Sequence, residues 1–253
     1  MWELDVGRVD GLDEVERGHL ARLIKLYNDH LNGNMTKDRY YEGRIPLREV
    51  NLGLALPEGV AGLEIGCAWG AKCVDVLAGR SMFDGFVGMN GEDVTALDGI
   101  VRGNRLIAEY AKACRDELKY GCTFATLSGD AEGGCRIRFH SPKTAAAIWS
   151  GELGRLERGF AIIDAAPVDG DLRRWEPSVA AYYTDNAVWT LRRYPGNVWR
   201  AEEQRHRMGR PLMEPLIWNA TSGKPLGRSR IKEPVRRLIQ GYVRTIANAT
   251  IGL

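Results

Sequence analysis

The chain has 253 residues, of which 44% are hydrophobic and 27% are charged, and its formal net charge is +2. This is ordinary globular composition, and the length allows one large domain or two small ones with a buried core. The small net charge points to no class of partner, no apolar run is long enough to span a membrane, and the acidic start Met1–Asp5 is unlike a signal peptide.

Cysteine and histidine are scattered along the chain. The cysteine count is odd and no Cys-x-x-Cys pair occurs, which argues against a disulfide scaffold and against a zinc site. The histidines show no metal-ligand spacing. We expect free cysteines in a reducing cytoplasm, and ordinary core or surface histidines. These residues are Cys67, Cys73, Cys114, Cys122, Cys135, His19, His30, His140 and His206.

The first part of the chain is predicted to be helical. Apolar residues at helical spacing predict an amphipathic helix over about 12–32, which Asn32-Gly33-Asn34 should stop. A short second helix is expected from about Thr36 to Glu42, ending at Gly43. Glycine and proline then predict irregular structure from Pro46 to Pro57.

The stretch Leu63–Phe86 supports two interpretations. Its first eight residues resemble the Gly-rich turn of class I methyltransferases, in which an acidic residue, here Glu64, ends a strand. Ala68 stands where that motif has glycine, and its β-carbon would crowd a cofactor. The strand ahead of the turn would also be short and broken by glycines. The same residues fit a helix over about 63–81, followed by a strand at Phe83–Val87.

Two further helices are predicted before the pattern changes. Glu92 or Asp93 should cap a helix that Gly103-Asn104 interrupts. A longer helix follows from Arg105 to Tyr120, with Gly121 as its C-terminal cap.

After Gly121 the spacing becomes strand-like. A short helix is expected at Pro142–Trp149, and Asp185-Asn186 has the form of a two-residue hairpin turn. Helices followed by antiparallel strands predict the α+β class. The predicted strands are Cys122–Leu127, Arg136–His140, Phe160–Ala165, Ala180–Thr184, Ala187–Arg193 and Val198–Arg207.

The C-terminal part is predicted to be a loop and one helix. Met208–Gly227 is rich in proline and glycine and indicates a connecting loop. Ser229 should cap a final helix that runs to about Thr250, with Pro234 in its first turns.

No set of residues forms a recognisable catalytic or metal site. Ser128-Gly129-Asp130 and Asp164 have no histidine at a motif spacing. The pairs Glu202-Glu203 and Asp169-x-Asp171 are interpreted as solvated faces and turns rather than metal ligands. We therefore assign no catalytic, cofactor-binding or metal-binding residue and expect no enzyme activity.

Several segments, in order, resemble the portal protein family of tailed bacteriophages, of the siphophage head-tail connector type. The resemblance covers about residues 25–253, and it is the order of the segments that makes it specific. The segments are Tyr40-Tyr41-Glu42-Gly43, Leu52–Pro57, Trp69–Arg80, Phe83–Phe86, Gly103–Leu106, Lys119–Phe124, Ser141-Pro142 and Leu226–Ile231.

The resemblance implies a wing domain followed by a stem of two long helices, with a clip domain between them and a helical crown after them. Portal subunits form a ring, commonly a dodecamer, at one capsid vertex of the virion, after assembly in the host cytoplasm. Double-stranded DNA passes through the channel, and the partners are the terminase, the capsid and the head-completion proteins, with no membrane.

On this resemblance, residues 1–120 form the mainly helical part of the wing, 121–226 its strand-rich part and 227–253 the first stem helix. The chain stops at Leu253, about where that helix should end, so the clip, second stem helix and crown are expected to be absent. The apolar stripe of the last helix would then lack its usual partner. A class I methyltransferase or another nucleotide-binding α/β enzyme is the alternative function.

Basic residues are concentrated near the C-terminus. Between Arg192 and Arg244 there are 13 Lys or Arg and 4 Asp or Glu. Contact with DNA phosphates is one interpretation. Ion pairing between subunits, with a solvated surface, is the interpretation we favour, because tight phosphate binding would hold back DNA that must slide. Whether any residue binds DNA is unknown from the sequence.

Overall fold

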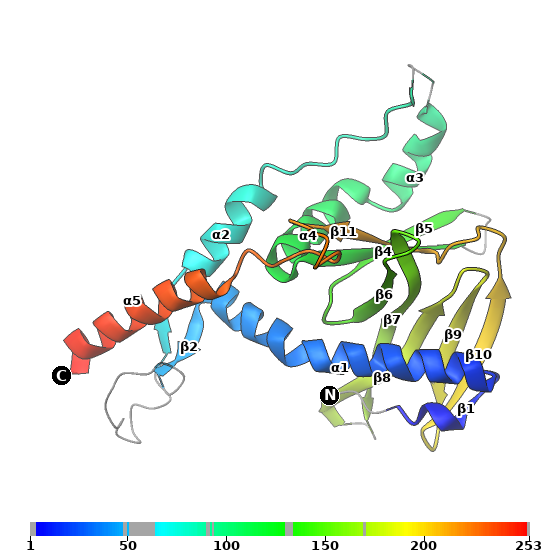
Figure 1. The fold of residues 1–253 in the computed structure, drawn as a ribbon, viewed down its shortest axis with the longest axis horizontal. Coiled ribbons are helices and arrows are strands. Elements are labelled where there is room, and N and C mark those ends of the chain that lie inside the picture. The colour runs from blue at the N-terminus through cyan, green and yellow to red at the C-terminus, as the bar shows by residue number, and fades with distance from the viewer. Residues whose placement is uncertain are drawn as a thin grey trace.

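The computed structural model describes residues 4–47, 50, 64–89, 92, 94–129, 134–168 and 171–251. Within these ranges the chain forms five α-helices and three sheets, of six, three and two strands. The α+β class expected from the sequence is confirmed (Figure 1). The proposed segment Leu52–Pro57 lies outside the described residues.

The largest sheet is built from consecutive antiparallel neighbours, apart from its first strand, which pairs in parallel with β10. Asp185-Asn186 joins β8 to β9 as predicted, and the amide of Thr184 donates to the carbonyl of Ala187 at 2.9 Å. In order across the sheet the strands are β1 (Val9–Asp10), β10 (Val198–Arg205), β9 (Ala187–Tyr194), β8 (Asp171–Tyr183), β7 (Arg155–Val168) and β6 (Ala145–Ser150).

Helix α1 (Glu14–Glu42) follows a short 3₁₀ turn, η1 (Val6–Arg8), and crosses one face of this sheet (Figure 1). Leu20 and Leu23 on its inner face are fully buried in one core with Phe160 and Tyr182 of the strands. The first third of the chain and the strand-rich part therefore share a hydrophobic core.

The predicted break in this helix at Asn32-Gly33-Asn34 is wrong, because α1 runs through it. Asn34 is buried, and its amide nitrogen donates to the carbonyl of Pro142 at 3.2 Å while its oxygen accepts from Lys37 at 3.0 Å. This tertiary partner satisfies a side chain that would otherwise compete with the helix backbone. The end of α1 at Gly43, in the left-handed conformation at φ 68°, agrees with the prediction.

A second sheet covers the other face. It has the order β11 (Met213–Ile217), β4 (Cys122–Gly129) and β5 (Cys135–His140), and packs with β6, β7 and β8 in a separate core. Strand β11 lies inside the segment predicted to be a loop. Its Pro215 cannot donate to a ladder, which is tolerated because β11 is an edge strand that pairs with β4.

The helix predicted at Pro142–Trp149 is also wrong, since this segment holds strand β6. Ala146 is buried in the core under α1, whereas Ala145 and Ala147 are buried in the core under the second sheet. Alternate residues of a strand face opposite sides. The alanines therefore suit a strand covered closely on both faces, although alanine by itself favours helix.

The helix predicted over 63–81 is shorter. Strand β3 (Glu64–Gly66) pairs antiparallel with β2 (Arg44–Pro46), and helix α2 (Trp69–Ala78) starts only after it. Phe83–Val87 is not a strand, because it forms no ladder with the described residues.

The next part has a 3₁₀ turn, η4 (Thr95–Leu97), then α3 (Asp98–Gly103) and α4 (Leu106–Tyr120). No side chain caps η4 or α3, so Glu92 does not have the predicted role, and Asp93 lies outside the described residues. Gly121 caps α4 as predicted.

Helix α5 (Glu233–Ile251) extends away from the sheets and ends near the C-terminus (Figure 1). Ser229 does not cap it: its hydroxyl donates to the carbonyl of Lys119 and accepts from the amide of Ile231. The apolar stripe finds a partner within the chain, since Ile239 and Val243 are fully buried with residues of α1, α2 and α4. Leu238, on another face, remains 65% exposed.

Gly33→Ala tests the continuity of α1. A methyl group there meets nothing within 4 Å, so the variant should gain about 0.5–1 kcal/mol from the better helix propensity of alanine. Urea unfolding measures the change. A matched Gly43→Ala change should destabilise, because its β-carbon would lie 2.5 Å from the carbonyl oxygen of Cys67. Loss of stability in Gly33→Ala would mean that the helix is broken there.

Candidate functional site

Four of the segments compared with the portal family pack together in one place. We call this place the motif junction: the end of α1 at Tyr40–Gly43, helix α2, the end of α4 at Leu118–Gly121, and the segment Gly227–Ile231. Residues from all of these segments or their immediate neighbours pack around the base of α5. The junction thus unites four of these segments that lie far apart in the sequence, whereas Phe83–Phe86, Gly103–Leu106 and Ser141-Pro142 lie outside it.

Glycine allows the close contacts of this junction. A β-carbon on Gly70 of α2 would lie 2.0 Å from the carbonyl oxygen of Tyr40, so α1 and α2 touch backbone to backbone. Gly121 and Gly227 have φ of 113° and 77°, and a β-carbon on Gly227 would lie 2.3 Å from the carbonyl oxygen of Gly121. Larger residues at these positions would push the elements apart.

Polar side chains join the helices of the junction. The hydroxyl of Tyr41 donates to Asp75 Oδ1 at 2.9 Å, and Arg115 Nε donates to the same oxygen at 3.0 Å. Burial and the bond to Asp75 raise the pKa of Tyr41 to about 12. One carboxylate thus connects α1, α2 and α4.

The segment before α5 is bonded to both neighbouring helices. The amide of Arg230 donates to the carbonyl of Leu118 at 2.8 Å, and its Nε donates to the carbonyl of Cys73 at 3.2 Å. Gln240 of α5 donates to the hydroxyl of Tyr40 at 2.5 Å. These bonds fix the direction in which α5 leaves the body.

A charge cluster lies beside the junction. Asp38 of α1 forms ion pairs with Lys119 at 2.9 Å and Lys143 at 2.5 Å, and accepts a hydrogen bond from Tyr120. Burial alone would raise the pKa of Asp38, but the hydrogen bonds from Lys143, Tyr120 and Lys119 outweigh it and lower the pKa. Asp38 therefore stays ionised and ties α1 to α4 and to the turn before β6.

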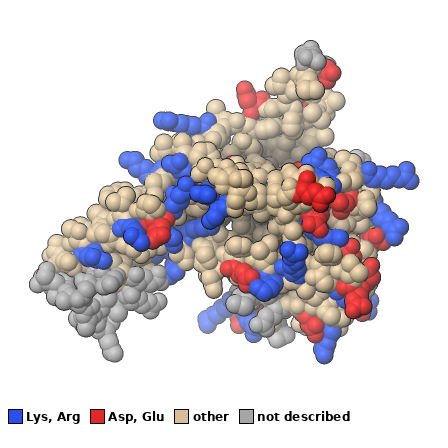
Figure 2. Space-filling model, viewed as in Figure 1, with Lys and Arg blue, Asp and Glu red and all other residues tan. Residues whose placement is uncertain are grey.

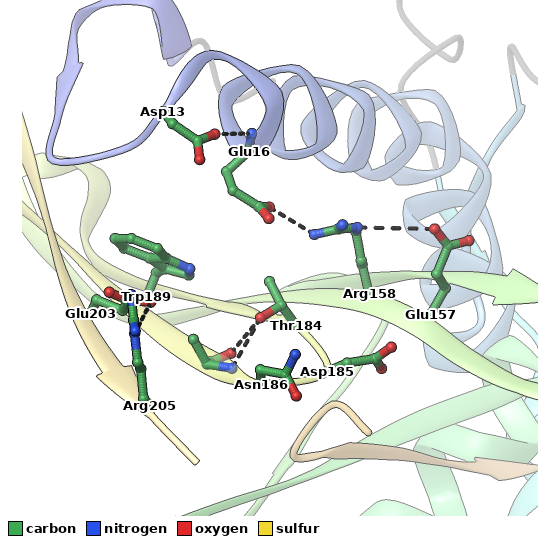
Figure 3. A pocket seen from close by; sticks show the side chains of 11 residues that line it. Asp13, Glu16, Glu157, Arg158, Thr184, Asp185, Asn186, Trp189, Glu203 and Arg205 are labelled. Atoms are coloured by element: carbon green, nitrogen blue, oxygen red, sulfur yellow. Dashed lines mark hydrogen bonds and ion pairs between the residues drawn. The ribbon is translucent and has the colours of Figure 1, made fainter. Parts of the chain in front are cut away.

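A pocket of about 510 Å³ opens at the start of α1, beside the β8–β9 turn (Figure 3). Its carboxylates have partners within the chain: Arg158 donates to Glu16 at 2.7 Å, Arg205 donates to Glu203 at 3.0 Å, and Asp13 caps α1. These contacts stabilise the fold. The arrangement brings no nucleophile next to a general base among the described residues.

Two other acidic candidates of the sequence accept hydrogen bonds from nearby backbone amides. Asp164 is exposed and accepts from the amide of Ala165 at 2.8 Å, and Asp171 accepts from the amide of Arg173 at 2.9 Å. Asp130 and Asp169 lie outside the described residues. Over the parts of the chain that are described, no cluster of His, Cys, Asp and Glu is suited to hold a metal ion.

The five cysteines are free thiols, and Cys67, Cys114 and Cys122 are buried. None of the helices in the described ranges is both long and apolar enough to cross a membrane.

His140 is buried between strands of the second sheet, where its Nε2 lies 3.0 Å from the hydroxyl of Thr126. Burial, with the charge of Arg138, lowers the pKa of His140 to about 4. The neutral imidazole is a structural hydrogen-bonding group of this core.

The sequence located the basic surplus but not the cleft that it surrounds. A cleft of about 750 Å³ lies between α1, β6 and the segment leading into α5. Lys and Arg gather over that segment on the visible face (Figure 2). Spacing along the chain gives no sign that Lys37 of α1 joins the C-terminal cations. The basic residues that line the cleft are Lys37, Lys224, Arg228, Lys232 and Arg236.

No known protein-family model matches this chain, and no curated protein is significantly similar to it.

Gly70→Ala tests the α1–α2 contact. The added methyl group must displace backbone, so the variant should lose about 1–3 kcal/mol of unfolding free energy. Gly18→Ala in α1 is the matched control, since a methyl group there meets nothing within 4 Å. Denaturant unfolding of both variants measures the difference. Equal free energies of unfolding in the two variants would show that α1 and α2 do not make this close contact.

His140→Gln tests the pH dependence of stability. His140 titrates at about 4 in the folded chain and at 6.5 as a free side chain, so the unfolded state takes up its proton first. The difference in pKa makes a contribution to the free energy of unfolding that is fully present above pH 6.5 and is lost as the pH falls toward 4. This contribution amounts to about 3 kcal/mol. Between pH 7 and pH 4 the melting temperature should therefore fall less in His140→Gln than in the wild type. Parallel pH curves would contradict the buried neutral state.

Proposed function

We propose that this chain is a portal subunit of a tailed bacteriophage, comprising a wing and the first stem helix. The observation that carries the proposal is the motif junction. Four of the segments that resemble the portal family, far apart in the sequence, make direct contact with one another and hold the base of α5.

The geometry of α5 supports the same function. The helix is fixed at its base by the bonds of Arg230 and by the buried side chains Ile239 and Val243. It then extends away from the sheets (Figure 1). A stem helix in a ring needs this combination, because its direction relative to the wing sets the angle between neighbouring subunits. On this proposal the partners are further copies of the chain, double-stranded DNA, the terminase, the capsid and the head-completion proteins.

The methyltransferase alternative has less support. It requires Glu64 at the end of a strand in a parallel sheet, whereas Glu64 starts β3, which pairs antiparallel with β2. Among the described strands the only parallel pair is β1 with β10, two residues long and far from Glu64 in the chain.

Sedimentation velocity over a wide range of concentration, followed by chemical crosslinking, tests the proposal. A cyclic ring uses a heterologous contact, so every partial assembly still presents one free face at each end. We therefore expect weak, reversible association that passes through dimers and trimers to larger species, with arcs or rings in electron micrographs. Association that ends at a two-fold symmetric dimer would contradict the ring.

Titration calorimetry with S-adenosylmethionine separates the two functions. We expect no binding heat, because Ala68 occupies the position of the motif glycine. Micromolar binding that is abolished by Gly66→Val would favour the methyltransferase instead.

A further inference from the structure

The basic cleft beside the junction contains cations without acidic partners. Among the described residues, Lys37, Lys224, Arg228, Lys232 and Arg236 form no ion pair with a carboxylate. The acid of the lining, Glu233, is bound instead by Arg237, at 2.9 Å. In the pocket of Figure 3, by contrast, Glu16 and Glu203 are paired with Arg158 and Arg205.

Two of these cations are partly buried in the cleft. Lys37 donates only to the oxygens of Asn34 and Tyr120, at 3.0 and 3.2 Å, and Arg236 has a buried Nε with no acceptor. Burial lowers the pKa of Lys37, and the charges of Arg236 and Lys224 lower it further. Bringing like charges together in a partly buried cleft is unfavourable unless an anion joins them.

The segment between α2 and α3 carries exposed apolar side chains and acidic residues. We call residues 81–89 the arm; residues 81–88 have no regular secondary structure, and the arm runs along the outside of the molecule (Figure 1). Val87 is 94% exposed, Met82 82% and Met89 80%. Phe83, which contacts Tyr110 of α4 at a ring distance of 5.7 Å, anchors the base of the arm. So much exposed apolar surface in one segment is typical of a binding surface.

The arm and the turn that follows it are acidic. Residues 81–101 contain no Lys or Arg. Asp84, Glu92 and Asp98 are exposed or half-buried and have no cationic partner among the described residues. In Figure 2 the described atoms near the top of the molecule are accordingly acidic or uncharged.

We propose that the arm of one copy of this chain docks in the basic cleft of the next copy. The inference rests on the proposed ring function for its head-to-tail geometry. Asp84, Glu92 and Asp98 would pair with the cations of the cleft. Val87 and Met89 would cover its apolar floor, which includes Tyr27, Phe124 and Leu226.

The apolar floor favours this occupant over a nucleic-acid backbone. Phosphates would pair with the cations but would leave the floor and the arm uncovered, whereas the arm carries both acidic and apolar groups. The arm and the cleft are also different surfaces of one chain. Their pairing is therefore heterologous and leads to a ring or an open chain rather than a two-fold dimer.

Two surface variants test the contact in the full chain. The cleft variant is Lys224→Glu with Lys232→Glu, both at exposed positions, and the arm variant is Val87→Ser with Met89→Ser. Each should weaken self-association about tenfold or more, through charge reversal or loss of buried apolar area. The matched controls, exposed Arg207→Glu and Val15→Ser, should associate as the wild type does. Thermal unfolding confirms that all four are folded.

Mixing the variants gives the sharper result. The cleft variant retains an intact arm and the arm variant an intact cleft, so the mixture should form a one-to-one dimer that grows no further. Mass photometry, with two-colour labelling, measures this dimer. Neither variant alone should form it at the same concentration.

Other outcomes would overturn the inference in distinguishable ways. If both variants associate beyond dimers as strongly as the wild type does, the ring proposal stands and the arm–cleft contact is excluded. Binding of a short DNA duplex or of pyrophosphate that the cleft variant abolishes, with self-association unchanged, would make the cleft a phosphate site. A wild-type chain that stays monomeric at its highest attainable concentration would exclude the contact outright.

Discussion

The structure depends on backbone contacts that only glycine permits. Gly70 places α2 against the end of α1, and Gly121 and Gly227 place the segment before α5 against the end of α4. Because these contacts have no side chains to adjust, the elements can approach in one arrangement only. The polar bonds of Asp75 and Arg230 then lock that arrangement, and α5 leaves the body in a fixed direction.

The distribution of charge points beyond the single chain. Asp38 and Glu16 are partly buried and are matched by cations of the same chain. The cleft cations, and Asp84 of the arm with Glu92 and Asp98 after it, form no ion pairs among the described residues. These two surfaces carry opposite charges, and the proposed contact between two copies of the chain would pair them.

The sequence pattern correctly predicted those elements that depend on interactions between residues close together in the chain. The cap at Gly121, the hairpin at Asp185-Asn186 and most strands after Cys122 follow from turn chemistry and alternation. The failures occur where tertiary contacts override local preference. Asn34 stays within a helix because Pro142 accepts its hydrogen bond, and the alanines of β6 form a strand because both faces are covered. Strand β11 escaped prediction because its ladder partner, β4, lies about ninety residues earlier in the chain.

The sequence by itself determined the α+β class, the free state of the cysteines, the basic surplus near the C-terminus and the order of the family-like segments. Only the tertiary structure decided that four of these segments form one junction, that Ile239 and Val243 of α5 are buried within the chain, and that Lys37 joins the C-terminal cations in a cleft. The physical reason is that spacing along a chain records which face of a helix or strand a residue occupies. It does not record which distant face will cover it, and burial, charge pairing and close backbone contact all depend on that second surface.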